Sequence, residues 1–189
     1  RGAGKTTWAQ QTFTNARHFD LLDEGLFQDY LRDAHLFGRE LLNIPKGQTV
    51  VVDEVQRLPA LLNEVHRFIE ERHLRFALLG SSARKLKRGG TNLLAGRATW
   101  RTMFPLLPEE LGTDFDLERT LRFGSIPLIW VAEDPAESLR AYVRLYLSEE
   151  IKAEAVVRNL PGFARFLPVA GLFHGQTVNT SSLARDAGV

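Results

Sequence analysis

The residues with the clearest chemical potential stand at the start of the chain, where glycines precede a lysine and two threonines. The run Gly2-Ala3-Gly4-Lys5-Thr6-Thr7 is the second half of the pattern Gly-x-x-x-x-Gly-Lys-[Ser/Thr]. Glycines let backbone N–H groups turn toward phosphate oxygens, and a helix that starts at the lysine presents its positive end to them. In such a loop Lys5 bridges the β- and γ-phosphates, and the Thr6 hydroxyl holds Mg²⁺. The alternative is a glycine turn that caps an ordinary helix.

A second element carries two acids. Val50-Val51-Val52-Asp53-Glu54 is a β-branched apolar run that ends in carboxylates, which is typical of a strand buried on both faces. Ligands of open α/β sheets bind at the carboxyl ends of such strands. Asp53 is expected to bind Mg²⁺ through water, and Glu54 to orient or deprotonate an attacking water. An ordinary strand leaving into solvent is the alternative, but the glycine loop upstream favours a nucleotide site.

Short strands and amphipathic helices must position these residues. Apolar spacing predicts helices over 5–14, 25–42 and 60–72, a short strand at the start of 16–23, and further strands over 49–54, 75–82 and 98–104. Alternation of strands and helices predicts an α/β domain with a parallel sheet. After about residue 111 strand signals fade. A helix is predicted over 134–157, with Asp134 as its cap, Pro135 at its first position and Glu137 in a capping box, and residues 159–163 are interpreted as a linker or turn.

Composition limits the other classes of function. The chain has 189 residues, enough to bury a core, and no apolar run long enough to span a membrane. It has no cysteine, which excludes disulfides and thiolate metal sites and fits a cytoplasmic protein. A net charge of +1 predicts no strong overall attraction to nucleic acid. The five histidines show no metal-binding spacing.

These elements resemble an AAA+ ATPase of the P-loop NTPase class with an additional strand and an Asp-Glu pair. Residues 50–71, Gly80-Ser81-Ser82 and 94–97 resemble a bacterial and archaeal group that joins an ATPase core to a winged helix and a C-terminal region. The resemblance implies an α/β core with helices on both faces over 1–110, a helical lid over 111–157, and the beginning of a winged helix over 158–189. It also implies ATP and Mg²⁺ as ligands, and Mg-dependent ATP hydrolysis that drives or gates a conformational change. A slow nucleotide-dependent switch in a DNA-binding protein is the alternative.

The resemblance assigns further roles to single residues. Ser81 or Ser82 stands where the family places a polar sensor of the γ-phosphate, and Arg97 is the candidate arginine finger, with a surface salt bridge as its alternative. Pro127, in "FGSIPLIW", matches a proline that packs against adenine, although Ser125 replaces the commoner glycine. We interpret Gln56 as a solvated helix cap, with a role in positioning water as the alternative.

The ends of the chain carry expectations about partners. Ala184 and Gly188 have the spacing of a helix-turn-helix, whose recognition helix would follow Val189; this unit either binds DNA or packs on its own ATPase domain. A homo-oligomer or a protein client remains open. The basic run 84–88 is interpreted as a solvated loop. We expect a strand before Arg1 to lie between 75–80 and 98–103, so that residues 1–189 alone fold poorly and bind ATP weakly.

Overall fold

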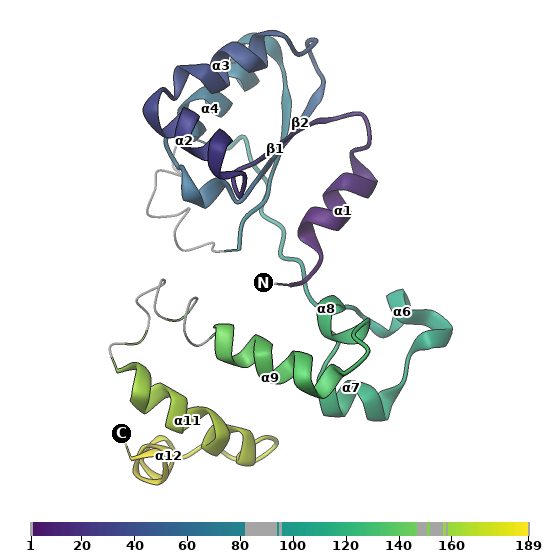
Figure 1. Cartoon of the computed structure of the whole chain (residues 1–189), viewed down its shortest axis with the longest axis vertical. Helices are drawn as coiled ribbons and strands as arrows, with labels where there is room; N and C mark the ends of the chain where they lie inside the picture. Colours follow the sequence, from purple (N-terminus) through teal and green to yellow (C-terminus); the bar gives the residue numbers. More distant parts are fainter. Residues whose placement is uncertain are drawn as a thin grey trace. The chain divides into compact units, whose positions relative to one another are not determined.

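The chain forms two compact units in a computed structural model that describes residues 2–81, 94, 96–146, 151, 157 and 159–188 (Figure 1). The first unit holds residues 1–116 and 125–128, and the second holds 117–124 and 129–189. The glycine loop, the sheet and both acids of the predicted site belong to the first unit. The predicted lid over 111–157 has residues in both units, and the predicted winged helix over 158–189 falls in the second; both stay predictions.

The first unit is built around a parallel sheet. Its strands are β1 (Arg17–Asp20), β2 (Thr49–Asp53) and β3 (Arg75–Leu78), in the order β1-β2-β3. Asp20 pairs with Asp53, and Val52 pairs with Leu78, so the carboxyl ends of the strands lie at one edge. The loop after β2 and the loop after β3 therefore begin side by side, and their polar side chains meet at this edge of the sheet.

Helices cover both faces of this sheet, as predicted. Val50 and Val52 point into the main core with α2 (Glu24–Arg32), α3 (His35–Leu42) and α4 (Leu61–Arg72). Val51, between them in sequence, packs on the opposite face with Ala9 of α1 (Lys5–Thr12). In Figure 1, α1 lies on one side of the strands, and α2, α3 and α4 lie on the other. Because successive strand side chains alternate between faces, the all-valine run serves both cores.

One predicted helix is two. Residues 25–42 were predicted as a single helix, but α2 ends at Arg32 and α3 begins at His35. Asp33 lies between them in an extended conformation, with φ −145° and ψ 93°. Its carboxylate accepts hydrogen bonds from the His35 backbone N–H (2.9 Å) and from Arg39 (2.9 Å). Aspartate competes for backbone donors in this way, and here it stands at the end of α2, while α3 begins after Ala34 with no side-chain cap.

An aromatic cluster fixes this helix pair on β1. The rings of Phe19, Tyr30 and Phe37 lie 5.1 to 6.4 Å apart, all buried. The Tyr30 hydroxyl donates to Glu40 Oε1 at 2.8 Å. Burial, together with the bond to Glu40, raises the pKa of Tyr30 well above its usual range. The hydroxyl therefore stays protonated and remains a donor at every physiological pH.

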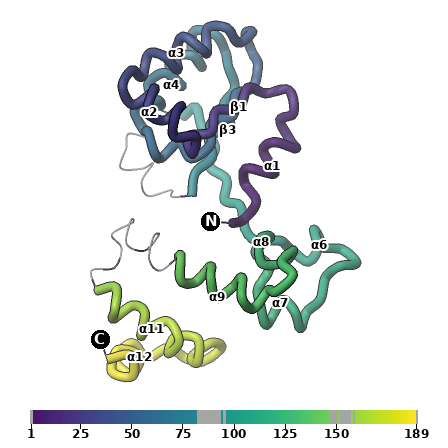
Figure 2. The backbone as a smooth tube through the Cα atoms, in the orientation of Figure 1, coloured from purple at the N-terminus to yellow at the C-terminus, as the bar shows by residue number. Residues whose placement is uncertain are grey.

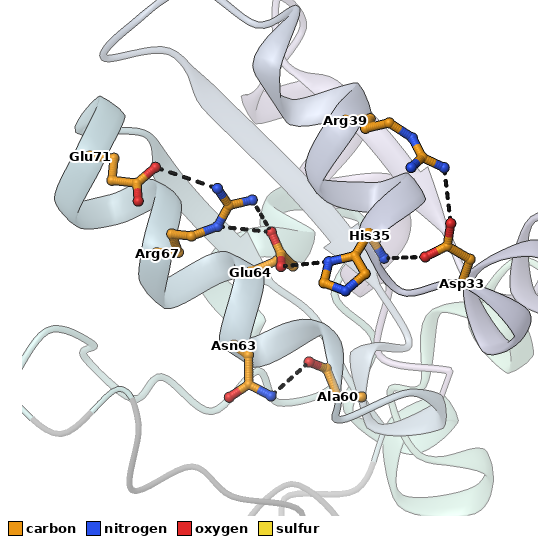
Figure 3. A network of polar contacts seen from close by, with 8 residues as sticks. All are labelled: Asp33, His35, Arg39, Ala60, Asn63, Glu64, Arg67 and Glu71. Atoms are coloured by element: carbon orange, nitrogen blue, oxygen red, sulfur yellow. Dashed lines mark hydrogen bonds and ion pairs between the residues drawn. The ribbon is translucent and has the colours of Figure 1, made fainter.

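A chain of polar contacts links α3 to α4 at the surface (Figure 3). Arg67 donates to Glu64 Oε2, with Nη2 at 2.5 Å, and also pairs with Glu71 at 3.5 Å. The same Glu64 carboxylate lies 3.8 Å from His35 Nδ1 on the other helix. The hydrogen bond to Glu64 raises the pKa of Arg67. Ion pairs this exposed contribute little stability each, so the apolar contacts of the two helices hold them together.

The outer edge of β3 faces a groove. A volume of about 890 Å³ is lined by β3, by α4, by residues 96–103, and by Lys5 and Trp8 of α1. The strand β3, labelled in Figure 2, is the last strand in the order β1-β2-β3. The strand predicted over 98–104 is not formed, because a segment becomes a strand only by pairing its backbone, and the groove separates these residues from β3.

The other regular elements in the described residues are helices. The first unit contains α6 (Pro108–Leu111) and the short turn η3 (Gly112–Asp114), and α8 (Pro127–Trp130) begins in the first unit and ends in the second. The second unit contains α7 (Leu117–Phe123), α9 (Pro135–Leu145), α11 (Leu160–Leu172) and α12 (Thr180–Ala187). None of the helices in the described residues is both long and apolar enough to cross a bilayer.

Helix caps in the second unit confirm one prediction and correct another. Asp134 caps α9 by accepting from the Glu137 backbone N–H at 2.9 Å, with Pro135 in the first turn, as predicted. The predicted linker at 159–163 is instead the start of α11, because Asn159 accepts from the Gly162 N–H at 3.0 Å and Pro161 is the second residue of the helix. Gly188, with φ +62°, ends α12.

Candidate functional site

The glycine loop has the backbone that a phosphate cradle requires. Gly2 and Gly4 have φ of +75° and +81°, in the left-handed region that side chains disfavour. Helix α1 begins directly after them at Lys5, so its first backbone N–H groups lie at the end of the loop. Lys5 is the first residue of this helix and borders the groove along β3. The helix start was predicted correctly, and the loop has the chemistry that binds anions.

Thr6 and Asp53 lie in direct contact, although 47 positions separate them. The Thr6 hydroxyl donates to Asp53 Oδ2, and the Glu54 backbone N–H donates to Asp53 Oδ1 at 2.8 Å. Asp53 is only 5% exposed and stands at the carboxyl end of β2. The two residues also line a small cavity of about 40 Å³ with Gln10, His18 and Asp20. The structure thus brings together the two residues that the sequence predicts as metal ligands.

Glu54 leaves the strand in an unusual conformation. Its φ of +53° and ψ of +37° are left-handed, which costs a non-glycine residue roughly 1–2 kcal/mol. The next residue is pinned to the sheet, because the Val55 N–H donates to the Leu79 carbonyl at 3.1 Å. The turn therefore directs the Glu54 side chain toward the end of β3 rather than along the strand. Backbone strain of this kind is concentrated at functional sites.

Two polar side chains hold the Glu54 carboxylate. Its Oε2 accepts from the Gln56 side-chain amide and from the Ser81 hydroxyl at 3.0 Å, while Gln56 Nε2 also lies 3.1 Å from Ser81 Oγ. Gln56 is only 9% exposed, so its interpretation as a solvated helix cap is wrong. The 3-10 turn η1 (Val55–Arg57) turns its side chain inward toward β3. Ser82, the other predicted sensor, lies outside the described residues, as does the basic run 84–88.

Arg57 anchors the same turn from the other side, and nothing in the sequence singled it out. Its guanidinium stacks over the Phe27 ring at 4.2 Å and donates to the Leu21 carbonyl. It also bonds Glu24 at 3.0 Å, and a hydrogen bond from Gln28 together with this one lowers the pKa of Glu24. Its partners lie in the loop after β1 and in α2, so no local sequence pattern could have indicated them.

Arg97 lies apart from the acids of the site. Its Nε donates to Glu70 on α4 at 2.5 Å, and this hydrogen bond lowers the pKa of the Glu70 carboxyl. Within this chain the described contacts of Arg97 are those of the surface salt bridge that the sequence left as the alternative. A finger acts on a neighbouring subunit or domain in the resembling family, and that role for Arg97 stays a prediction.

Pro127 lies next to the glycine loop. A Cβ built on Gly4 would come within 3.8 Å of Pro127 Cγ, an ordinary contact distance. Residues 125–128 are tied to the first unit, where the Leu106 N–H donates to the Ser125 carbonyl at 2.9 Å. The predicted adenine contact therefore stands beside the predicted phosphate loop. Its role toward a base stays a prediction.

The donor set of the site fits Mg²⁺. Hard cations of this kind prefer oxygen ligands, and Thr6 Oγ1 and the Asp53 carboxylate already meet there. Asp53 is buried but has both oxygens engaged by donors, which is how a carboxylate is held at a fixed orientation. The described residues, this site included, hold no cluster of three or more His, Cys, Asp or Glu side chains that could bind a metal ion.

Comparison with known proteins identifies the family. A family model described as the AAA domain matches residues 1–112, more than half of the chain. The chain therefore belongs to the AAA domain family, whose members are nucleotide-binding proteins of the ATPase type. No curated protein and no solved structure matches it. The matched segment contains the glycine loop, the sheet, both acids and the Gln56–Ser81 pair.

Proposed function

We propose that this AAA domain binds ATP with Mg²⁺ at the carboxyl edge of its sheet and hydrolyses the bond between the β- and γ-phosphates. The observation that supports this best is the contact between Thr6 and Asp53. It joins the end of the glycine loop to the end of the acid strand, and each belongs to a separate half of the phosphate-loop ATPase pattern. Two independent sequence patterns meeting at one point are difficult to explain by a turn and a strand end alone.

Each residue of the proposed site has a defined role. The N–H groups of the loop from Gly2 to Thr6 bind phosphate oxygens, and Lys5 places its charge at the β- and γ-phosphates. Thr6 and Asp53 would hold Mg²⁺, which supplies positive charge to the phosphate oxygens when bound. Glu54 orients the attacking water and accepts its proton. Ser81, just beyond β3, has one hydroxyl proton, which bonds Glu54 here and would turn to the γ-phosphate when nucleotide is bound. Pro127 packs against adenine.

The proposed consequence of hydrolysis is mechanical. Ser81 and Glu54 are hydrogen-bonded at 3.0 Å across the ends of β3 and β2, so a change at the γ-phosphate alters a contact between two elements. This supports a role in driving or gating a conformational change in the rest of the protein. Single-turnover kinetics on the complete protein would measure the rate of hydrolysis. Fast turnover favours a motor, and one slow turnover favours a switch.

Substitution of Lys5 tests nucleotide binding. We expect Lys5→Ala to weaken the affinity for ATP about 10- to 100-fold, since a charge-assisted contact to phosphate contributes roughly 1.5–3 kcal/mol. Binding is measured at equilibrium with a fluorescent ATP analogue on the complete protein, with and without Mg²⁺. Lys46→Ala is the matched control, because Lys46 is exposed in the turn at the opposite end of β2. Equal affinity of both variants and the wild type would contradict the assignment of the loop.

A further inference from the structure

The side chain of Gln56 is buried although one of its two polar atoms has no hydrogen-bond partner in the described residues. Its Nε2 donates to Glu54 Oε2 and lies 3.1 Å from Ser81 Oγ. Its Oε1 is fully buried and finds no hydrogen-bond donor in the described part of the chain. A buried acceptor without a partner costs about 1–3 kcal/mol. The sequence therefore keeps an amide at a position where an apolar side chain would avoid that cost.

The orientation of the amide follows from its neighbour. If Gln56 were rotated to exchange its oxygen and nitrogen, Oε1 would face the Glu54 carboxylate, and two acceptors would repel each other. The amide nitrogen must therefore point at Glu54, and the unpartnered oxygen is the consequence. The Gln56 side chain therefore donates to the Glu54 carboxylate and leaves its own oxygen without a hydrogen bond.

The two donors act on one oxygen of Glu54. The Gln56 amide and the Ser81 hydroxyl both bond Oε2, and Oε1 accepts neither of these bonds. A carboxylate fixed through one oxygen presents the other in a defined direction. The left-handed backbone at Glu54 sets where the side chain starts, and the two donors set where it ends.

We propose that Gln56 is a positioning residue, which fixes Oε2 of Glu54 and so orients this carboxylate to accept the proton of the water that attacks the γ-phosphate. This inference rests on the proposed ATPase function. Gln56 does not touch the water or the nucleotide in this role, since it acts through Glu54. Without the amide, Glu54 is still a base, but it loses the donor that stays on its carboxylate when Ser81 turns to the γ-phosphate, and a misplaced base reacts more slowly.

The test compares Gln56→Met in two backgrounds. Methionine has nearly the volume of glutamine and no donor, so it preserves packing and removes the buried unpartnered oxygen. In the wild-type background we expect kcat for ATP hydrolysis to fall about tenfold, a fraction of the roughly 10²–10⁴-fold that a positioned general base contributes. In the Glu54→Gln background, where the base is absent, we expect Gln56→Met to cause no further loss in single-turnover hydrolysis.

Two further measurements separate positioning from packing. The equilibrium affinity for ATP should stay within about twofold and the thermal midpoint within a few degrees, since the loop and the core keep their contacts. Gln48→Met is the matched control, because Gln48 is exposed beside the opposite end of β2, and its kcat should equal that of the wild type. If Gln56→Met folds poorly, Gln56→Asn is measured in its place. This variant keeps the amide on a shorter side chain, so its kcat is expected to fall less than its loss of stability alone would predict.

The outcomes distinguish this inference from the function on which it rests. If the wild type releases no phosphate, the proposed function fails and the positioning role falls with it. If the wild type hydrolyses ATP but Gln56→Met keeps or raises kcat, only the positioning role is overturned. An equal loss in both backgrounds would also overturn it, because Gln56 would then act independently of Glu54.

Discussion

Glu54→Gln is expected to lower kcat for ATP hydrolysis at least about 100-fold while the affinity for ATP stays within a few-fold. Glutamine has the shape of glutamate, and its carbonyl oxygen can still accept from Gln56 and from Ser81. It cannot take a proton from water at neutral pH, so the loss falls on the chemical step. Binding depends on the glycine loop and on Lys5, which the substitution leaves in place.

Steady-state kinetics and equilibrium binding on the complete protein check this expectation. Glu71→Gln is the matched control, because Glu71 is exposed on α4 and pairs only weakly with Arg67 at 3.5 Å. The control should keep the kcat of the wild type, since it removes at most a surface ion pair. Hydrolysis by Glu54→Gln at the rate of the wild type would show that another group is the base.

Phe37→Ala is expected to lower the free energy of unfolding by about 3–5 kcal/mol, the usual cost of removing a buried phenylalanine. The side chain is 0% exposed and its ring lies 5.1 Å from Phe19 on β1 and 5.5 Å from Tyr30 on α2. Its removal opens a cavity where α2, α3 and the sheet meet. Because small domains are stable by only about 5–15 kcal/mol, this is a large part of the total.

Chemical denaturation measures this loss. Leu42→Ala, on the same helix, is the matched control, because Leu42 is 50% exposed and its truncation should change the free energy of unfolding little. Similar losses for the two variants would mean that the core of the first unit lies elsewhere. An unchanged stability of Phe37→Ala would contradict the packing of α3 on β1.

Part of the site could be predicted from sequence because each half of it is a local pattern. The glycines before Lys5 and the valines before Asp53 are readable within a few residues, and the parallel topology brings the ends of strand and loop together. The contact between Thr6 and Asp53 follows from those two facts. The alternation of the valines between two cores was predictable for the same reason.

The features that could not be predicted from the sequence depend mainly on contacts between residues distant in the chain. The burial of Gln56 requires the end of β3, 25 positions away, and Arg57 finds Leu21 and Glu24 more than 30 positions back. The break at Asp33 had a local signal, since aspartate before a short apolar run can cap a helix, but the apolar spacing on both sides concealed it. The strand expected over 98–104 needs a paired neighbour, which spacing alone cannot supply.

Release of phosphate from ATP labelled at the γ-position tests the central claim most directly. With the complete protein and Mg²⁺, the label is expected to appear as free phosphate, to stop when Mg²⁺ is chelated, and to fall at least about 100-fold in Glu54→Gln. Label that stays in ATP, moves to an acceptor instead of water, or is released equally by Glu54→Gln would contradict an ATPase site built on Thr6, Asp53 and Glu54.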